Sequence, residues 1–129
     1  MLDTNTASLL MKGQPNVVER LKAAKPERIC LSAVTEAELL YGAARRPEAR
    51  KLRAAVDELL AAIDVLPWTS ATARRYALIG VELERRGRPL GALDLMIAAH
   101  AVEHDAVLVT NDRAFDAVPG LRIEDWTAA

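Results

Sequence analysis

Asp94 is a carboxylate in a stretch that is otherwise almost entirely apolar, GALDLMIAAHA (residues 91–101). An ionised carboxylate taken out of water is costly unless something compensates its charge. A helix N-terminus can compensate it, because acidic side chains in the first turn interact favourably with the helix dipole. A bound metal ion can do the same. Asp94 taken alone leaves both explanations open.

Three other acids stand close to the ends of predicted strands. Asp3 ends the segment MLD, Glu38 lies on the predicted helix that follows RICLS, and Asp112 lies two residues after the end of AVLVT. In open parallel sheets, functional sites form at the carboxyl ends of the strands. We therefore expect these acids to converge with Asp94 at one edge of a sheet.

The two glutamates of the helix AVTEAELLYGAARR are expected to face different ways. The spacing i, i+3, i+7 predicts an inward stripe formed by Val34, Ala37 and Tyr41. At about 100° per residue, Glu38 lies next to this stripe and Glu36 lies nearly opposite. Glu38 is therefore the glutamate expected to point inward, and Glu36 is expected to be solvated.

Four converging carboxylates favour a divalent cation, because the cation relieves their mutual repulsion. Ligand sets made only of oxygen atoms suit Mg²⁺ or Mn²⁺ and do not suit zinc. Such a cation can activate a water molecule and neutralise charge that develops on a phosphoryl group. The acids thus predict metal-assisted phosphoryl chemistry.

A second metal pattern, HAVEH, is less persuasive. His100 and His104 are four residues apart, but a zinc protease needs the order H-E-x-x-H, and here Glu103 directly precedes the second histidine. We therefore expect no zinc hydrolase. His100 is expected to pack in the core, and His104 to lie at the end of its helix.

The elements that must position these residues alternate along the chain. Strands are expected over 1–3, 28–32, 64–67, 106–110 and 121–126, and helices over 6–13, 15–24, 33–46, 47–63, 70–87, 92–105 and 112–118. This alternation predicts an α/β sandwich around a parallel sheet. The short, continuously apolar strands are typical of a sheet that is covered on both faces.

Composition narrows the class of protein further. The 129 residues suit one domain, 51% are hydrophobic and 27% are charged, and the single cysteine, Cys30, excludes an internal disulfide. No apolar run reaches the about 18 residues of a membrane span, and the N-terminus carries no signal-peptide pattern, so we expect a cytoplasmic protein. A net charge of −1 argues against a strong, non-specific polyanion binder.

Arginines nevertheless cluster along the chain, and their purpose stays open between solvated helix faces and phosphate contacts. The clusters are Arg45, Arg46, Arg50 and Arg53, then Arg74 and Arg75, then Arg85, Arg86 and Arg88.

Five segments resemble, in the same order, the motifs of PIN-domain proteins, and more closely those of the VapC-type toxins of bacterial toxin–antitoxin pairs. They are MLDTN, LSAVTEAELLYG, GALDLMIAAHA, LVTNDRAF and VPGLRIEDW, and they extend over essentially the whole chain. The resemblance implies a PIN-like three-layer α/β/α sandwich with a short-stranded, mainly parallel central sheet, formed as a single domain by residues 1–129.

The resemblance also implies an activity and a site. Members of the family are metal-dependent endoribonucleases that hydrolyse RNA phosphodiester bonds with Mg²⁺ or Mn²⁺ in an acidic pocket. By position in the motifs, the catalytic and metal-binding residues are Asp3, Glu38, Asp94 and Asp112, and the second-tier pocket residues are Asn5 and Thr110. Asp116 is a nearby alternative to Asp112, and we expect it to lie on the surface of a helix.

Partners follow from the same resemblance. It implies an RNA substrate, with tRNA as a candidate, a small antitoxin whose tail lies across a groove and the pocket, and a homodimer. The chain begins two residues before Asp3, so we expect a minimal first strand. If translation starts further upstream, the added residues would affect stability more than chemistry.

Two other functions remain alternatives to a toxin. One is a housekeeping RNA-processing PIN nuclease, and the other is a non-catalytic PIN-fold interaction module. The presence of all four acids argues against the module. No motif in the chain is known to read bases, so the sequence does not name an RNA target.

Overall fold

A short parallel sheet forms the centre of the computed structural model, which describes residues 1–128. Its strands are β1 (Cys30–Ser32), β2 (Asp64–Leu66), β3 (Leu108–Val109) and β4 (Ile123–Glu124). β1 pairs with β2 and β3 pairs with β4, both in parallel, and Leu2 bridges Leu31 of β1 to Val109 of β3. The order across the sheet is therefore β2, β1, the N-terminal segment, β3 and β4.

The N-terminal segment holds the two halves of the sheet together. Leu2 donates its N–H to the Cys30 carbonyl at 3.0 Å, and Asp3 donates to the Val109 carbonyl at 3.0 Å. The Val109 N–H donates in turn to the Met1 carbonyl at 2.8 Å. Three residues thus form the central strand, as expected from MLD, and Asp3 lies at its carboxyl end.

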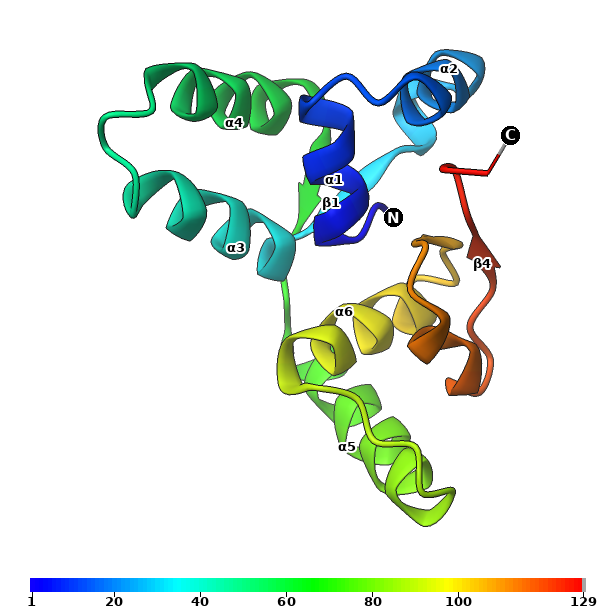
Figure 1. Ribbon diagram of the computed structural model, residues 1–129. Coiled ribbons are helices and arrows are strands. Elements are labelled where there is room, and N and C mark those ends of the chain that lie inside the picture. The colour runs from blue at the N-terminus through cyan, green and yellow to red at the C-terminus, as the bar shows by residue number, and fades with distance from the viewer. Residues whose placement is uncertain (129) are drawn as a thin grey trace.

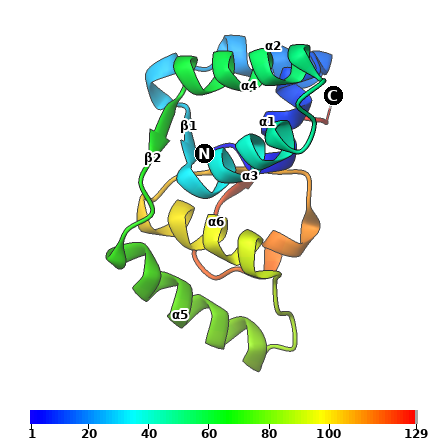
Figure 2. The same cartoon turned by 90° about the vertical axis from the view of Figure 1, so that its left-hand side faces the viewer.

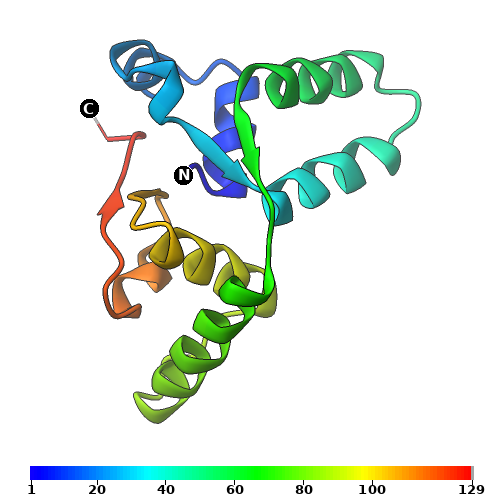
Figure 3. The same cartoon turned by 180° about the vertical axis from the view of Figure 1, so that it is seen from behind.

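Helices cover both faces of this sheet (Figure 1). Figure 2 shows α2 and α4 in one part of the molecule and α5 and α6 in the opposite part, and Figure 3 shows β1 and β2 between the two groups. The helices are α1 (Thr4–Met11), α2 (Pro15–Ala23), α3 (Ala33–Ala44), α4 (Arg50–Ala62), α5 (Ser70–Arg85) and α6 (Ala92–Glu103), with 3-10 turns η1 (Pro26–Arg28) and η2 (Arg113–Ala117).

Two apolar cores lie on opposite faces of the sheet. Met1 and Leu108 belong to the core that includes α5 and α6, whereas their neighbours Leu2 and Val109 belong to the core that includes α1, α2 and α4. This division follows from the period of two in a strand, which sends successive side chains to opposite faces. The three-layer α/β/α arrangement is therefore confirmed.

Every predicted element is present, with differences at the ends. α1 begins at Thr4 instead of residue 6, because the Asp3 side chain accepts a hydrogen bond from the Thr6 N–H at 2.8 Å and so caps the helix. α4 begins at Arg50 instead of residue 47, and the turn after β3 is a 3-10 helix. Over residues 1–128, none of the helices combines the length and apolarity that a membrane crossing would need.

The predicted inward stripe of α3 was wrong. Ala37 is exposed and Tyr41 is 65% exposed, whereas the buried positions are Val34, Thr35, Leu39 and Ala43. The reason is tertiary, since α3 packs against α1, α4 and α6 and must bury a stripe that serves all three. The Tyr41 ring is covered instead by the Arg45 guanidinium, at 5.5 Å from the ring centroid.

The predicted orientations of the two glutamates of α3 agree only in part with the structure. Glu38 lies beside the true buried stripe and still turns toward the interior, although the reasoning that chose it was incorrect. Glu36 is half-buried and not fully solvated.

Helix α5 offers a matched test of the core. Leu83 is completely buried in the α5–α6 core, and Leu78 on the same helix is 70% exposed. Leu83→Ala is expected to lower the free energy of unfolding by about 2–5 kcal/mol, through lost burial and the cavity left behind. Leu78→Ala is expected to change it by less than about 0.5 kcal/mol. Urea denaturation of both variants measures the difference, and equal losses would contradict this assignment of the core.

Candidate functional site

All four predicted acids line one pocket at the carboxyl edge of the sheet, here called the acidic pocket. Its cavity is about 650 Å³. Asp3 follows the central strand, Glu38 comes from the middle of α3, Asp94 from the first turn of α6, and Asp112 from the turn after β3. The other lining residues are Thr4, Asn5, Ser8, Asn111, Arg113 and Phe115.

Asp3 is the most firmly held of the four acids. Its backbone N–H is bonded to β3, and one of its carboxylate oxygens, Oδ1, caps α1 through the Thr6 N–H. The side chain is only 5% exposed. The central strand ends and α1 begins at this one residue, with no loop between them. The fold therefore holds the Asp3 carboxylate in a fixed position at the pocket.

Glu38 is oriented by Thr4, a residue that the sequence analysis did not single out. The Thr4 hydroxyl donates to Glu38 Oε1 at 2.6 Å and also lies 3.3 Å from the Thr35 hydroxyl. This hydrogen bond joins the start of α1 to α3. The only signal in the sequence was the position of Thr4 directly after Asp3.

Asp94 shows that the acids act on one another. Burial raises the pKa of Asp94 above its ordinary value of 3.8, and the negative charges of Asp112, Glu38 and Asp3 raise it further, in that order. A favourable helix dipole alone would lower this pKa. Residues 1–128 contain no ion pair that includes any of the four carboxylates. Burial and neighbouring negative charge therefore act on Asp94 in the direction opposite to a helix start.

Asp112 lies at the exposed side of the pocket. Its Oδ1 accepts from the Ala114 N–H at 2.9 Å and caps η2, while its own N–H donates to the Thr110 hydroxyl at 3.0 Å. Thr110 is buried and positions Asp112 without lining the pocket itself. The alternative acid, Asp116, is exposed and lies 3.8 Å from Arg113, outside the pocket lining.

Asn5 ties α1 to the loop after β3. Its side-chain N–H donates to Asn111 Oδ1 at 2.9 Å, and both residues line the pocket. Asn111 and Arg113 were missed by the sequence analysis because their contribution depends on this contact between distant segments. Asn5 thus lines the pocket, and its role there stays a prediction.

The donor set suits a hard divalent cation. The pocket offers carboxylate, amide and hydroxyl oxygens, the ligand types that Mg²⁺ and Mn²⁺ prefer. No three of these carboxylates, within the described residues, bring ligand atoms to within 4.8 Å of one another. Mg²⁺ commonly keeps several of its waters and binds through one or two carboxylates, so this wider spacing fits a partly hydrated ion.

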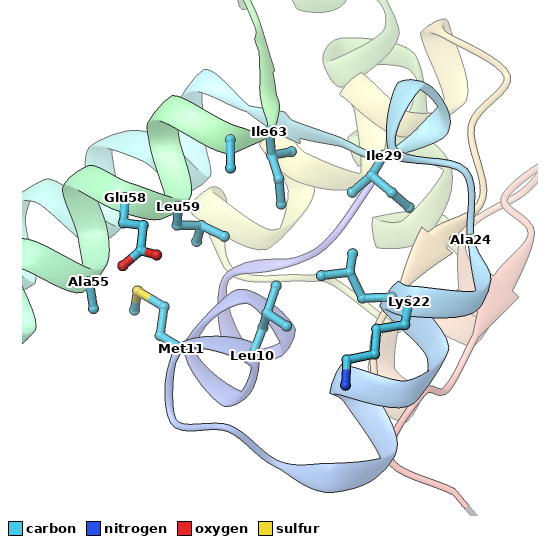
Figure 4. A pocket seen from close by; sticks show the side chains of 11 residues that line it. Leu10, Met11, Lys22, Ala24, Ile29, Ala55, Glu58, Leu59 and Ile63 are labelled. Atoms are coloured by element: carbon cyan, nitrogen blue, oxygen red, sulfur yellow. The ribbon is translucent and has the colours of Figure 1, made fainter.

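Two further cavities lie along α1, and one of them adjoins the acidic pocket. The first, the apolar groove, is about 560 Å³ and lies between α1, α2 and α4; Figure 4 shows Leu10, Met11 and Leu59 among the side chains along it. The second, the connecting groove, is about 520 Å³. It shares Met11 and Ala55 with the apolar groove, and Thr4, Ser8 and Glu38 with the acidic pocket. The three cavities are therefore neighbours in series, with the connecting groove between the apolar groove and the acidic pocket; together they are called the path.

Positive charge accompanies this path. Lys12, Arg46 and Lys51 line the connecting groove, and Arg113 lines the acidic pocket. The nine clustered arginines named above are all exposed, so both solvation and phosphate contact remain open to them.

Comparison with known proteins agrees with this geometry. The PIN-domain family model matches residues 1–121. The tRNA(fMet)-specific endonucleases VapC of Salmonella typhimurium and Shigella flexneri are 38% and 39% identical to this chain, with 98% of this chain covered in both cases and 96% and 97% of the relatives. A crystal structure of DNA-bound VapBC from Salmonella typhimurium matches with a TM-score of 0.91 at 39% identity, covering 98% of this chain and 96% of that chain.

Each match with a VapC relative extends over nearly the full length of this chain and of the relative. It includes the segments that carry all four acids. The chain therefore belongs to the PIN-domain family and, within it, to the VapC ribonucleases, the toxins of VapBC toxin–antitoxin systems.

Proposed function

We propose that the acidic pocket is the catalytic centre of this ribonuclease and that Asp3, Glu38, Asp94 and Asp112 hold Mg²⁺ or Mn²⁺ there. The observation that carries the proposal is that four carboxylates from four separate elements line one pocket, and that none of them forms an ion pair within residues 1–128. Burial and the three neighbouring negative charges raise the pKa of Asp94, in agreement with that convergence. When bound, the cation supplies an activated water and neutralises charge on the scissile phosphate.

The chain's own residues prepare the pocket for that chemistry. Asp3 is fixed by the sheet and by the start of α1, and Glu38 is fixed by the Thr4 hydroxyl. Both carboxylates are therefore oriented before a ligand arrives, which lowers the cost of reorganisation. Asp112 and Arg113 lie at the exposed side, where an RNA phosphate would enter.

We propose a tRNA substrate, on the strength of relatives that are tRNA(fMet)-specific endonucleases. RNA of this kind is recognised through shape, unstacked loops and backbone contacts. Since the chain has a net charge of −1, its grip on phosphates must come from local cations, and the pocket and connecting groove provide Arg113, Lys12, Arg46 and Lys51. Such a substrate also places the protein in the cytoplasm.

We further propose that a small antitoxin occupies the path formed by the apolar groove and the connecting groove. Solved complexes of related toxins contain a VapB partner. An apolar segment would suit the groove between α1, α2 and α4, and a tail continuing past Lys12 and Arg46 would reach Glu38. An antitoxin placed in this way would block the pocket that RNA must enter.

The homodimer stays a prediction. α5 carries two exposed large apolar side chains, Leu78 and Val81, that a second copy could cover. Sedimentation of the purified chain would decide the oligomeric state, and a monomer at all concentrations would contradict a dimer.

Asp94→Asn is expected to reduce metal-dependent RNA cleavage by more than about 100-fold. Mutating a residue that only hydrogen-bonds to a metal ligand already lowers metal affinity or activity by about 10–100-fold, and loss of a ligand should cost more. Asp116→Asn is the matched control, because Asp116 is exposed and lies outside the pocket. Cleavage of a pool of cellular RNAs with Mg²⁺, with Mn²⁺ and with EDTA measures both variants. A folded Asp94→Asn protein that cleaves as fast as wild type would contradict the proposed site. Absence of Mn²⁺ binding at millimolar concentration would instead favour an interaction module.

Removing the charge of Asp94 is also expected to stabilise the metal-free protein at pH 7. Because the folded-state pKa of Asp94 is raised, the folded chain binds this proton more tightly than the unfolded chain. The stabilising contribution of the protonated Asp94 carboxyl is thus lost as the pH rises from about 4 through the raised folded-state pKa. Urea denaturation in EDTA should show Asp94→Asn above wild type at pH 7, with the difference vanishing at low pH.

The opposite sign would favour the simpler explanation for Asp94. If its main contribution were to the helix dipole, Asp94→Asn would be less stable at pH 7 by about 0.3–1 kcal/mol.

Ala62→Trp is expected to weaken antitoxin binding about tenfold or more. Ala62 is exposed at the end of α4 and lines the apolar groove, so an indole there would fill the space of the partner, and overpacking costs about 1–3 kcal/mol. Ala61→Trp is the control, since Ala61 is also exposed on α4 but does not line the groove. Calorimetric titration with the cognate antitoxin compares them, and equal affinities would place the antitoxin elsewhere.

A further inference from the structure

The last turn of α6 gathers three potential metal ligands at the end of the helix opposite to Asp94. One ring nitrogen each of His100 and His104 and one carboxylate oxygen of Glu103 lie within 4.8 Å of one another. The spacings i, i+3 and i+4 place these side chains on one side of the helix. At 1.5 Å per residue, His104 lies about 15 Å along the helix axis from Asp94.

His100 has bonding capacity that the described chain does not use. Its side chain is fully buried, and its Nδ1 lies 2.7 Å from the Ser32 hydroxyl oxygen, whereas Nε2 has no hydrogen-bond partner among residues 1–128. An unsatisfied buried polar atom costs about 1–3 kcal/mol and calls for an explanation. In the tautomer whose Nδ1 proton is donated to Ser32, Nε2 carries the lone pair and is the ring nitrogen left to bind an ion.

Glu103 is held in place from the neighbouring helix. The buried Thr72 hydroxyl of α5 donates a short hydrogen bond to Glu103 Oε2, and the same oxygen lies 3.9 Å from His104 Nε2. Ser32 and Thr72 thus hydrogen-bond to His100 and Glu103, two of the three ligands. Metal ligands are commonly oriented by such hydrogen-bonding partners. His104 is exposed and ends the helix, so the site opens to solvent on its side.

We propose that His100, Glu103 and His104 form a second cation site, specific for a Zn²⁺-like transition metal and separate from the acidic pocket. Two imidazoles and one carboxylate are typical zinc ligands, and a water completes four-coordination. Mg²⁺ prefers an all-oxygen set. Ligand atoms lie about 2 Å from bound zinc, so the cluster must contract on binding, and the exposed His104 is the ligand with most freedom to move.

Three protein ligands leave one coordination position to water, but the turn is not arranged as a zinc-hydrolase centre. Glu103 serves as a ligand, and the turn lacks the H-E-x-x-H order that would supply a general base. A bound ion would join α6 to α5 through Thr72 and to the end of β1 through Ser32. It would therefore stabilise the helix pair whose first turn carries Asp94.

Titration of Zn²⁺ against a chromogenic chelator tests the proposal in the full chain. Asp94→Asn is used as the background, because it disables the acidic pocket, and Mg²⁺ is kept in excess. One equivalent of Zn²⁺ is expected to bind. Adding His104→Ala or Glu103→Gln should weaken this binding about tenfold or more, whereas Asp105→Asn should not. Asp105 is the adjacent exposed acid and contacts Arg122 instead, at 3.0 Å.

Two further readouts keep the result unambiguous. Co²⁺ bound in place of zinc should give the visible absorption of a tetrahedral site, and Zn²⁺ should raise the Tm of the background protein but not of its His104→Ala form. His104 is chosen over His100 because its removal leaves the core intact. Absence of Zn²⁺ binding, or binding that is unaffected by either substitution, would overturn the proposal.

Discussion

Mutual repulsion among four carboxylates at one edge of a very short sheet is the constraint on which the rest of this structure depends. Burial and neighbouring negative charge raise the pKa of Asp94, and no cationic side chain in the described residues pairs with any of the four acids. Like charges held together destabilise a fold. Two apolar cores, one on each face of the sheet, offset this cost.

The fold fixes the acids because neighbouring elements are joined directly or by a side-chain hydrogen bond. Asp3 is at once the last residue of the central strand and the cap of α1, and Thr4, the first residue of α1, fixes Glu38 on α3. α6 carries Asp94 in its first turn and His100 in its last. One buried helix thus connects the proposed catalytic centre with the proposed zinc site, and both sites depend on its packing against α5.

The alternation of elements could be predicted from local pattern, whereas the full set of four acids also needed the resemblance to PIN-domain motifs, because the local argument for Glu38 used the wrong stripe. Strand ends and apolar periodicity are readable along the chain, and they indicated Asp3 and Asp112 correctly as pocket residues. Contacts between segments that are distant in the chain could not be predicted from the sequence. The inward stripe of α3 was misplaced onto Ala37 and Tyr41, and Thr4 and Asn111 were missed, because their places depend on which helices pack together.

A crystal of the protein soaked in Mn²⁺ and measured at the manganese absorption edge would locate the cation most directly. We expect an anomalous peak in the acidic pocket, within bonding distance of Asp94 and of at least one of Asp3 and Glu38. The Asp94→Asn crystal should lose that peak. A peak found only beside His100 and Glu103, or no peak at all at saturating Mn²⁺, would contradict the assignment of the four acids as a metal-binding catalytic centre.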